Sequence, residues 1–186
     1  GRTPWAMFTE LARHDLSWET VRIFQVDERV APSGDPDRNL THLNRALSGA
    51  PAEVVAMPVE ADDLDSAALD YARLLPPRFD LVHLGIGPDG HTASLVPGDP
   101  VLEVDDRLVA VTAPYEGHRR MTLTYPCLAR ADCLLWLITG AEKADALARL
   151  VRGDRSIPAG RVRARRSVIL ADEAAASGLQ TNRLCG

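Results

Sequence analysis

The sequence predicts an α/β fold built around parallel strands, and three observations predict it. Short aliphatic and β-branched runs alternate along the chain with Ala- and Leu-rich stretches. The β-branched runs carry little polar alternation, which is typical of parallel strands buried on both faces. The chain has 186 residues, 46% of them hydrophobic, which is the ordinary range for a globular domain.

The first half of the chain alternates helices with short strands. A helix is expected over 5–14, because Pro4 suits a first helical turn, and a strand over 21–26 follows it. A loop is expected over 28–38. The pattern then predicts a helix over 39–47 closed by Ser48 and Gly49, a strand over 54–57, and a helix over 65–75 ended by Pro76 and Pro77.

The second half is richer in strands. The run 79–84 is the clearest central strand, because it is apolar and bounded by turn residues. A helix is expected after Gly140, over 141–152, and the remaining strands are predicted over 108–112, 121–124, 134–139 and 167–170.

Composition excludes several classes of protein. The net charge of −5 argues against a general nucleic-acid surface, and the basic run 161–166 has no interleaved aromatic residue, so we interpret it as a solvated turn. The longest apolar run, 133–138, has six residues, far fewer than the roughly 20 that cross a bilayer. Three cysteines without C-x-x-C spacing indicate neither a disulfide framework nor a zinc site, and favour a reducing, cytoplasmic setting: Cys127, Cys133 and Cys185.

The segment 84–98 carries the strongest chemical signal. Its Gly85-x-Gly87-x-x-Gly90 pattern formally matches a dinucleotide fingerprint, but Pro97 leaves room for only about two helical turns. The glycines are better explained as a sharp turn at the carboxyl end of a central strand, where open α/β sheets bind ligands. His91 would project at that edge, with the Asp89 carboxylate two residues away to orient it. His91 is therefore a candidate catalytic residue.

Charged residues directly follow the strand expected over 21–26. Asp27, Glu28 and Arg29 form either a solvated turn or the rim of an active site, and the residues alone favour the turn. Asn39, by the same reasoning, is most simply the start of a helix.

Two cationic positions come later in the chain. Arg119 and Arg120 head a predicted strand, and Lys143, the only lysine, falls in the first turn of a predicted helix. A cation at a helix N-terminus opposes the helix dipole, so either it is simply tolerated there or a partner such as Glu142 or a bound phosphate offsets it.

Several segments, taken in order, resemble the 6-phosphogluconolactonase family. GRTP resembles the end of the family's Ser-Gly-Gly-x-Thr-Pro loop, VDERVAP followed by Asn39 its Val-Asp-Glu-Arg loop, and GIGPDGHTASLVPG its Gly-His signature. The segments RMTLT, GAEK and DEAAA resemble later family blocks. The resemblance implies a Rossmann-like open, mostly parallel sheet with helices on both faces. It also implies hydrolysis of 6-phospho-D-glucono-1,5-lactone to 6-phosphogluconate, without a cofactor or a metal.

The resemblance also implies site residues. His91 matches the family's general base and Asp89 the acid beside it. The expected substrate-binding residues are Gly1, Arg2, Thr3, Asp27, Arg29, Asn39, Gly87, Gly90, Arg120 and Lys143. The only expected partner is a sugar-phosphate lactone, with no nucleic acid and no membrane, and we expect a monomer or a weak homo-oligomer.

The chain also departs from the family pattern. The family's first strand and the Ser-Gly of its phosphate loop would precede Gly1, so residues 1–186 are expected to form a single domain that lacks its N-terminal segment. Arg38 stands where the family commonly has Ser before Asn. Two other functions remain open: a glucosamine-6-phosphate deaminase or isomerase, which would need a Glu shortly after His91, and a sugar-phosphate-binding module without catalytic activity.

Overall fold

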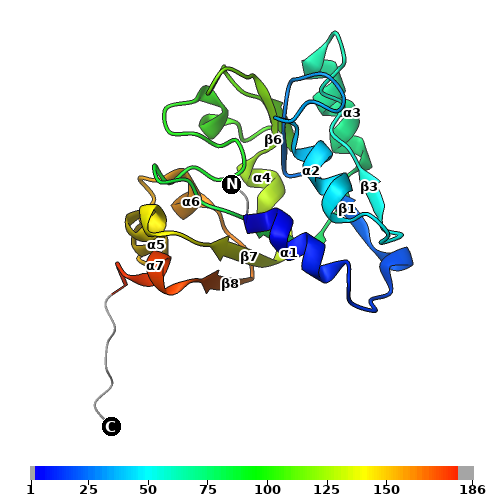
Figure 1. Cartoon of the computed structure of the whole chain (residues 1–186). Coiled ribbons are helices and arrows are strands. Elements are labelled where there is room, and N and C mark those ends of the chain that lie inside the picture. The colour runs from blue at the N-terminus through cyan, green and yellow to red at the C-terminus, as the bar shows by residue number, and fades with distance from the viewer. Residues whose placement is uncertain (1–2, 180–186) are drawn as a thin grey trace.

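The structure, a computed structural model, describes residues 3–179 (Figure 1). Within that range the α-helices are short and alternate with strands, as the hydrophobic pattern predicts. The helices are α1 (Thr3–Leu11), α2 (Asn39–Ala46), α3 (Leu64–Leu74), α4 (Tyr125–Leu128), α5 (Ala144–Val151), α6 (Pro158–Arg161) and α7 (Glu173–Ala176). The strands are β1 (Arg22–Phe24), β2 (Asp27–Arg29), β3 (Glu53–Val55), β4 (Phe79–Leu84), β5 (Val109–Val111), β6 (Arg120–Leu123), β7 (Ala131–Ile138) and β8 (Arg166–Ala171).

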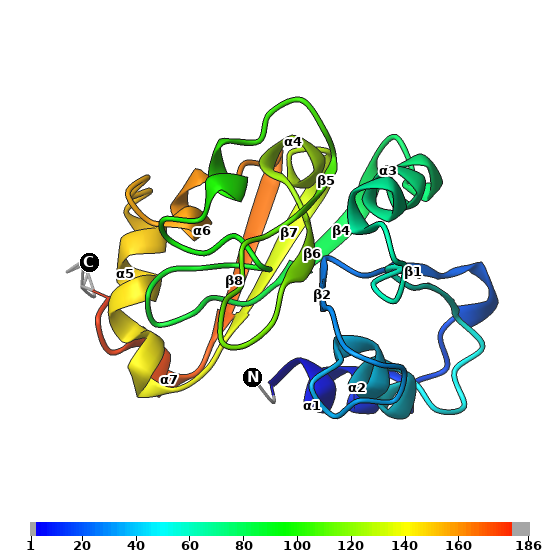
Figure 2. The ribbon, with the colours of Figure 1, turned by 90° about the horizontal axis from the view of Figure 1, so that it is seen from above.

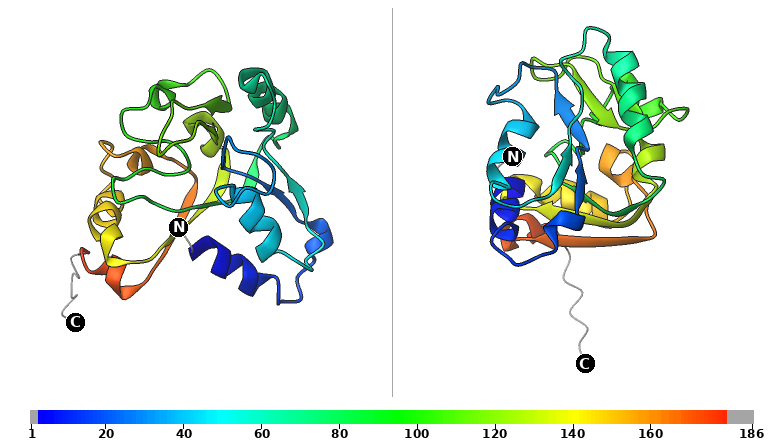
Figure 3. Two further views of the ribbon diagram at one scale, coloured as in Figure 1. Left: turned by 45° about the horizontal axis from the view of Figure 1, so that its top comes forward. Right: turned by 90° about the vertical axis from the view of Figure 1, so that its right-hand side faces the viewer.

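The parallel strands form two hydrogen-bonded groups. In one, β7 lies between β4 and β8, and in the other β1 pairs with β3. Figures 2 and 3 show α3 on one side of β1 and the α1–α2 pair on the other. The expected α/β class, with mostly parallel strands and helices on both faces, is confirmed.

The third group of strands is antiparallel, and it corrects two expectations. β6 lies between β2 and β5, so the strands expected over 108–112 and 121–124 form a hairpin rather than joining the parallel sheet. Asp27–Arg29, interpreted above as a solvated turn, is the strand β2. Local hydrophobicity marks a strand but carries no information on the direction of its neighbour, because pairing joins residues far apart in sequence.

The core is one large cluster with a smaller one beside it. The large cluster lies between the β4–β7–β8 group, the β5–β6 hairpin and α3, and its wholly buried side chains include Tyr71, Met121 and Leu147. The smaller cluster joins Trp18, Leu43 and Leu47, with α1 packed over it. No helix within residues 3–179 has the length and apolar character needed to span a membrane.

Helix boundaries follow local capping chemistry. Asp63 accepts hydrogen bonds from the backbone N–H groups of Asp65 and Ser66, both at 3.1 Å, and so caps the start of α3. The helix expected over 141–152 begins instead as a 3₁₀ turn, Ala141–Lys143, and becomes α-helical only at α5. Two further 3₁₀ turns lie at Trp18–Thr20 and Pro100–Glu103.

Candidate active site

The carboxyl ends of β1 and β4 line a cavity of about 1450 Å³. Such an edge is where open α/β sheets bind their ligands. Eight of the residues predicted from sequence line this one cavity, although they come from six separate segments of the chain: Thr3, Asp27, Arg29, Asn39, Gly87, His91, Arg120 and Lys143. Gly1 and Arg2, also predicted, lie outside the described residues.

His91 and Asp89 form a hydrogen-bonded pair at this edge. Nδ1 of His91 lies 2.7 Å from Oδ1 of Asp89, and the His91 backbone N–H donates to the same oxygen at 3.1 Å. Because a carboxylate only accepts hydrogen bonds, Nδ1 carries a proton, and in the neutral ring Nε2 keeps its lone pair. Partial burial works to raise the pKa of Asp89, but the hydrogen bonds and charge of His91 outweigh it and lower that pKa. The ring is thus oriented as a base.

The glycines of the same loop have different roles. A Cβ on Gly87 would lie 2.2 Å from two atoms of the His91 ring and 2.6 Å from Asp89, so any other residue there would have to displace these two side chains. Gly90 does not line the cavity. Its φ of +84° requires glycine, and a Cβ there would lie 2.5 Å from Ile157. Backbone conformation and packing therefore account for a glycine at this position, and its contact with substrate stays a prediction.

Gly87→Ala is expected to lower kcat roughly 100-fold, because the new methyl group must displace the His91 ring and a shift of about 1 Å can cost that much. Steady-state rates with 6-phospho-D-glucono-1,5-lactone, the substrate that the family resemblance implies, would measure this effect. Gly85→Ala is the matched control, since a Cβ there meets no atom within 4 Å. Equal rates for the two variants would contradict this account of the loop.

A second polar network joins β2 to the loop after β4. Ser94 Oγ donates to Asp27 Oδ2 at 2.7 Å, and Asn39 Nδ2 lies 3.2 Å from Asp27 Oδ1. Arg29 Nη1 donates to Asn39 Oδ1 at 2.6 Å. Burial raises the pKa of Asp27, although the Ser94 hydrogen bond and the nearby guanidinium groups oppose that rise. The network holds Asp27, Arg29 and Asn39 along one wall of the cavity.

Glu28 faces away from the cavity and holds this wall in place. It is wholly buried, and its carboxylate accepts from the backbone N–H groups of Asn39 at 2.7 Å and Leu40 at 2.8 Å, which caps the start of α2. Gln25 Nε2 donates to it at 2.9 Å, and Arg38 Nε lies 3.1 Å away. Sequence reasoning missed this role. Once residues 27–29 are known to form the strand β2, the period of two explains it, since Asp27 and Arg29 face the cavity and Glu28 must point the other way.

Arg120 is the most buried of the cationic residues that line the cavity. Only 4% of it is exposed, and its guanidinium carbon lies 5.0 Å from the ring centre of Tyr115. Tyr115 in turn packs edge-on against His91, with the ring centres 5.9 Å apart. Tyr115 therefore connects the cation to the candidate base, and no sequence pattern pointed to it.

The family comparison agrees with this geometry. A family model described as "Glucosamine-6-phosphate isomerases/6-phosphogluconolactonase" matches residues 1–171. The chain belongs to this family. A 6-phosphogluconolactonase from Mycobacterium tuberculosis is 38% identical over an alignment of 186 positions, which covers 88% of this chain and 75% of that protein. One from Synechocystis is 37% identical over an alignment of 161 positions, which covers 79% of this chain and 67% of that protein.

Solved structures of the family share the fold. The crystal structure of the 6-phosphogluconolactonase from Thermotoga maritima superposes with a TM-score of 0.84 at 31% identity. The match covers 92% of this chain and 81% of the Thermotoga chain. The resemblance to the 6-phosphogluconolactonase family noted from the sequence motifs is therefore confirmed.

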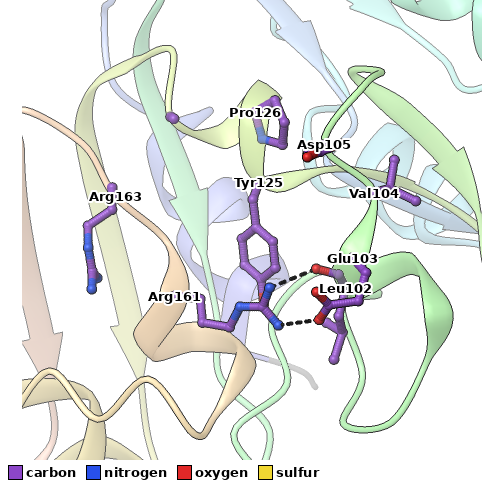
Figure 4. A pocket seen from close by; sticks show the side chains of 9 residues that line it. Leu102, Glu103, Val104, Asp105, Tyr125, Pro126, Arg161 and Arg163 are labelled. Atoms are coloured by element: carbon purple, nitrogen blue, oxygen red, sulfur yellow. Dashed lines mark hydrogen bonds and ion pairs between the residues drawn. The ribbon is translucent and has the colours of Figure 1, made fainter.

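A smaller cavity of about 410 Å³ is lined by none of the predicted site residues (Figure 4). There Arg161 packs over the Tyr125 ring at 4.7 Å, pairs with Glu103 at 3.0 Å, and donates to the carbonyl of Leu102 at 2.9 Å. Arg163 donates to two backbone carbonyls. Part of the basic run 161–166 therefore serves local folding contacts.

Proposed function

We propose that this chain hydrolyses 6-phospho-D-glucono-1,5-lactone to 6-phospho-D-gluconate, a step of the oxidative pentose phosphate pathway. The observation that carries the proposal is the His91–Asp89 pair, whose histidine lines one cavity with Arg29, Arg120 and Lys143 in a member of this family. A base, a carboxylate that orients it and several cations are what hydrolysis of an anionic ester requires.

His91 acts as the general base. Its Nε2 takes a proton from a water molecule as the water oxygen attacks the lactone carbonyl carbon. Asp89 stabilises the imidazolium that forms, because its carboxylate already holds Nδ1 at 2.7 Å. When the tetrahedral intermediate collapses, the bond from the former carbonyl carbon to the ring oxygen breaks, and His91 returns the proton to that oxygen. The products are a carboxylic acid, which ionises, and a free hydroxyl group.

Cations along the cavity bind the two anionic groups of the reacting substrate, its phosphate and the oxyanion that develops at the carbonyl oxygen. Arg120, nearly buried, suits the phosphate because its fork of donors matches phosphate oxygens. Lys143, in the 3₁₀ turn before α5, adds charge at the same cavity. Arg29 stabilises the developing oxyanion. Binding energy from the remote phosphate orients the lactone carbon against the water. Thr3, Asp27, Asn39 and Gly87 complete the wall that the sugar contacts.

We further propose that the lactone is this protein's only required partner and that the chain works in the cytoplasm as a monomer or weak homo-oligomer. Cys127 and Cys133 are both buried free thiols, which supports a reducing compartment.

The purified chain is expected to accelerate lactone disappearance above the spontaneous rate, followed through 6-phosphogluconate dehydrogenase and its nicotinamide absorbance. 6-Phosphogluconate is expected to raise Tm, since a ligand present at about 100 times its Kd stabilises the native state by about 2.7 kcal/mol. Turnover of glucosamine 6-phosphate without lactone hydrolysis would favour the deaminase alternative. Binding without turnover would favour the non-catalytic module.

A further inference from the structure

The hairpin between β5 and β6 ends in an unusual turn. Tyr115 and His118 exchange backbone hydrogen bonds at 2.9 and 3.2 Å, which leaves Glu116 and Gly117 as a two-residue loop. Both loop residues have positive φ, +48° and +84°. A turn of this kind ordinarily carries Asn-Gly or Asp-Gly, because long side chains are disfavoured in the left-handed region. The conformational preference of Glu116 does not explain its position.

The Glu116 carboxylate supplies a different reason. Its Oε2 lies 3.2 Å from Nη2 of Arg120, so it is the counter-ion of the cation assigned above to the phosphate. The Arg120 side chain is 5% exposed and the Glu116 side chain 67% exposed. Nε of Arg120 is buried without a hydrogen-bond partner in the described part of the chain. The guanidinium is therefore incompletely satisfied within residues 3–179, and the carboxylate that pairs with it there comes from the solvent side.

We propose that Glu116 is the counter-ion that the substrate phosphate replaces: it occupies Arg120 until a phosphate displaces it. This inference rests on the proposed function and names the group of the substrate that Arg120 selects. A phosphate monoester carries close to two negative charges and three acceptor oxygens, against one charge and two oxygens for the carboxylate. Phosphate can therefore displace Glu116 and also satisfy Nε, whereas an uncharged sugar lactone gains nothing from Arg120.

Tyr115 links the Arg120 position to the candidate base. Tyr115, next to Glu116 in the turn, contacts the Arg120 guanidinium on one side and the His91 ring on the other. A phosphate that replaces Glu116 would therefore bind one aromatic ring away from His91. This places the phosphate end and the reacting end of the lactone on either side of Tyr115.

The test is the affinity of Glu116→Gln for 6-phosphogluconate and for unphosphorylated gluconate, measured by titration calorimetry. Loss of the competing charge is expected to tighten 6-phosphogluconate binding about two- to five-fold, the effect of one exposed ion pair, and to leave gluconate unchanged. The KM for the lactone should fall by the same factor, with kcat unchanged. Glu103→Gln is the matched control, because Glu103 is also an exposed partner of an arginine, 3.0 Å from Arg161, outside this cavity.

Several outcomes would overturn the inference. They are unchanged or weaker 6-phosphogluconate binding by Glu116→Gln, an equal gain for gluconate, an equal gain in Glu103→Gln, or no binding of 6-phosphogluconate to either the wild type or Glu116→Gln. Glu116→Asn guards against a folding artefact, since Asn suits the turn and also removes the charge. If Glu116→Gln binds 6-phosphogluconate more tightly but no variant hydrolyses the lactone, the inference stands and the proposed hydrolase function fails.

Discussion

His91→Ala is expected to lower kcat for lactone hydrolysis about 10²- to 10⁴-fold, the usual contribution of a positioned general base. The loss follows from the geometry: Asp89 holds Nδ1 at 2.7 Å and leaves Nε2 as the free base on the cavity. KM should change little, because the cations that bind the phosphate remain. Initial rates across a range of lactone concentrations, corrected for spontaneous hydrolysis, measure both constants.

Two companion variants make this result specific. His14→Ala removes an exposed histidine whose only ionic contact is Glu10 at 3.8 Å in the described structure, so it should retain the wild-type kcat. Asp89→Asn should lower kcat less than His91→Ala, because the base survives but loses the carboxylate that orients it and stabilises its charged form. A kcat for His91→Ala within a few-fold of the wild type would refute the assignment of the base.

Glu28→Ala is expected to lower the free energy of unfolding by about 3–5 kcal/mol, the cost of removing one partner from a buried ion pair. Arg38, 3% exposed, would keep its charge without its nearest carboxylate, and the first N–H groups of α2 would lose their acceptor. Urea unfolding, followed by circular dichroism, gives the midpoint and the slope from which the change in free energy is obtained.

Glu53→Ala is the control for Glu28→Ala. Glu53 also pairs with an arginine between strands, at 2.7 Å from Arg22, but both side chains are more than half exposed. Such surface pairs contribute about 0–1 kcal/mol, so Glu53→Ala should unfold nearly as the wild type does. Similar losses for the two variants would mean that burial does not set the importance of Glu28.

The local pattern predicted most of the secondary structure. The run expected as the central strand, 79–84, is β4 with the same bounds, and the helix expected over 65–75 is α3 within one residue at each end. Pro76 and Pro77 end that helix through their own backbone geometry, which any sequence reading can use. The antiparallel pairing of β5 and β6 could not be read in this way, because it depends on contacts between distant residues.

In the candidate site, too, some relations could be predicted from the sequence and others depended on tertiary packing. The short spacing of Asp89 and His91 made their contact foreseeable, and motif resemblance indicated Arg120 and Lys143. Nothing local indicated that Glu28 would be buried or that Tyr115 would lie between Arg120 and His91. Those relations arise where β2 pairs with β6 and the hairpin tip is brought over the glycine loop.

The sequence by itself determined the α/β class, the glycine turn that presents His91, and the family. These follow from the hydrophobic period, the turn residues and the order of the motifs, all of which can be identified in the sequence without knowing the tertiary contacts. Only the tertiary structure decided which charges face the cavity and which are buried beneath it. Burial depends on which segments pack together, and packing alone separates Glu28, a buried structural carboxylate, from Asp27 and Arg29 on either side of it.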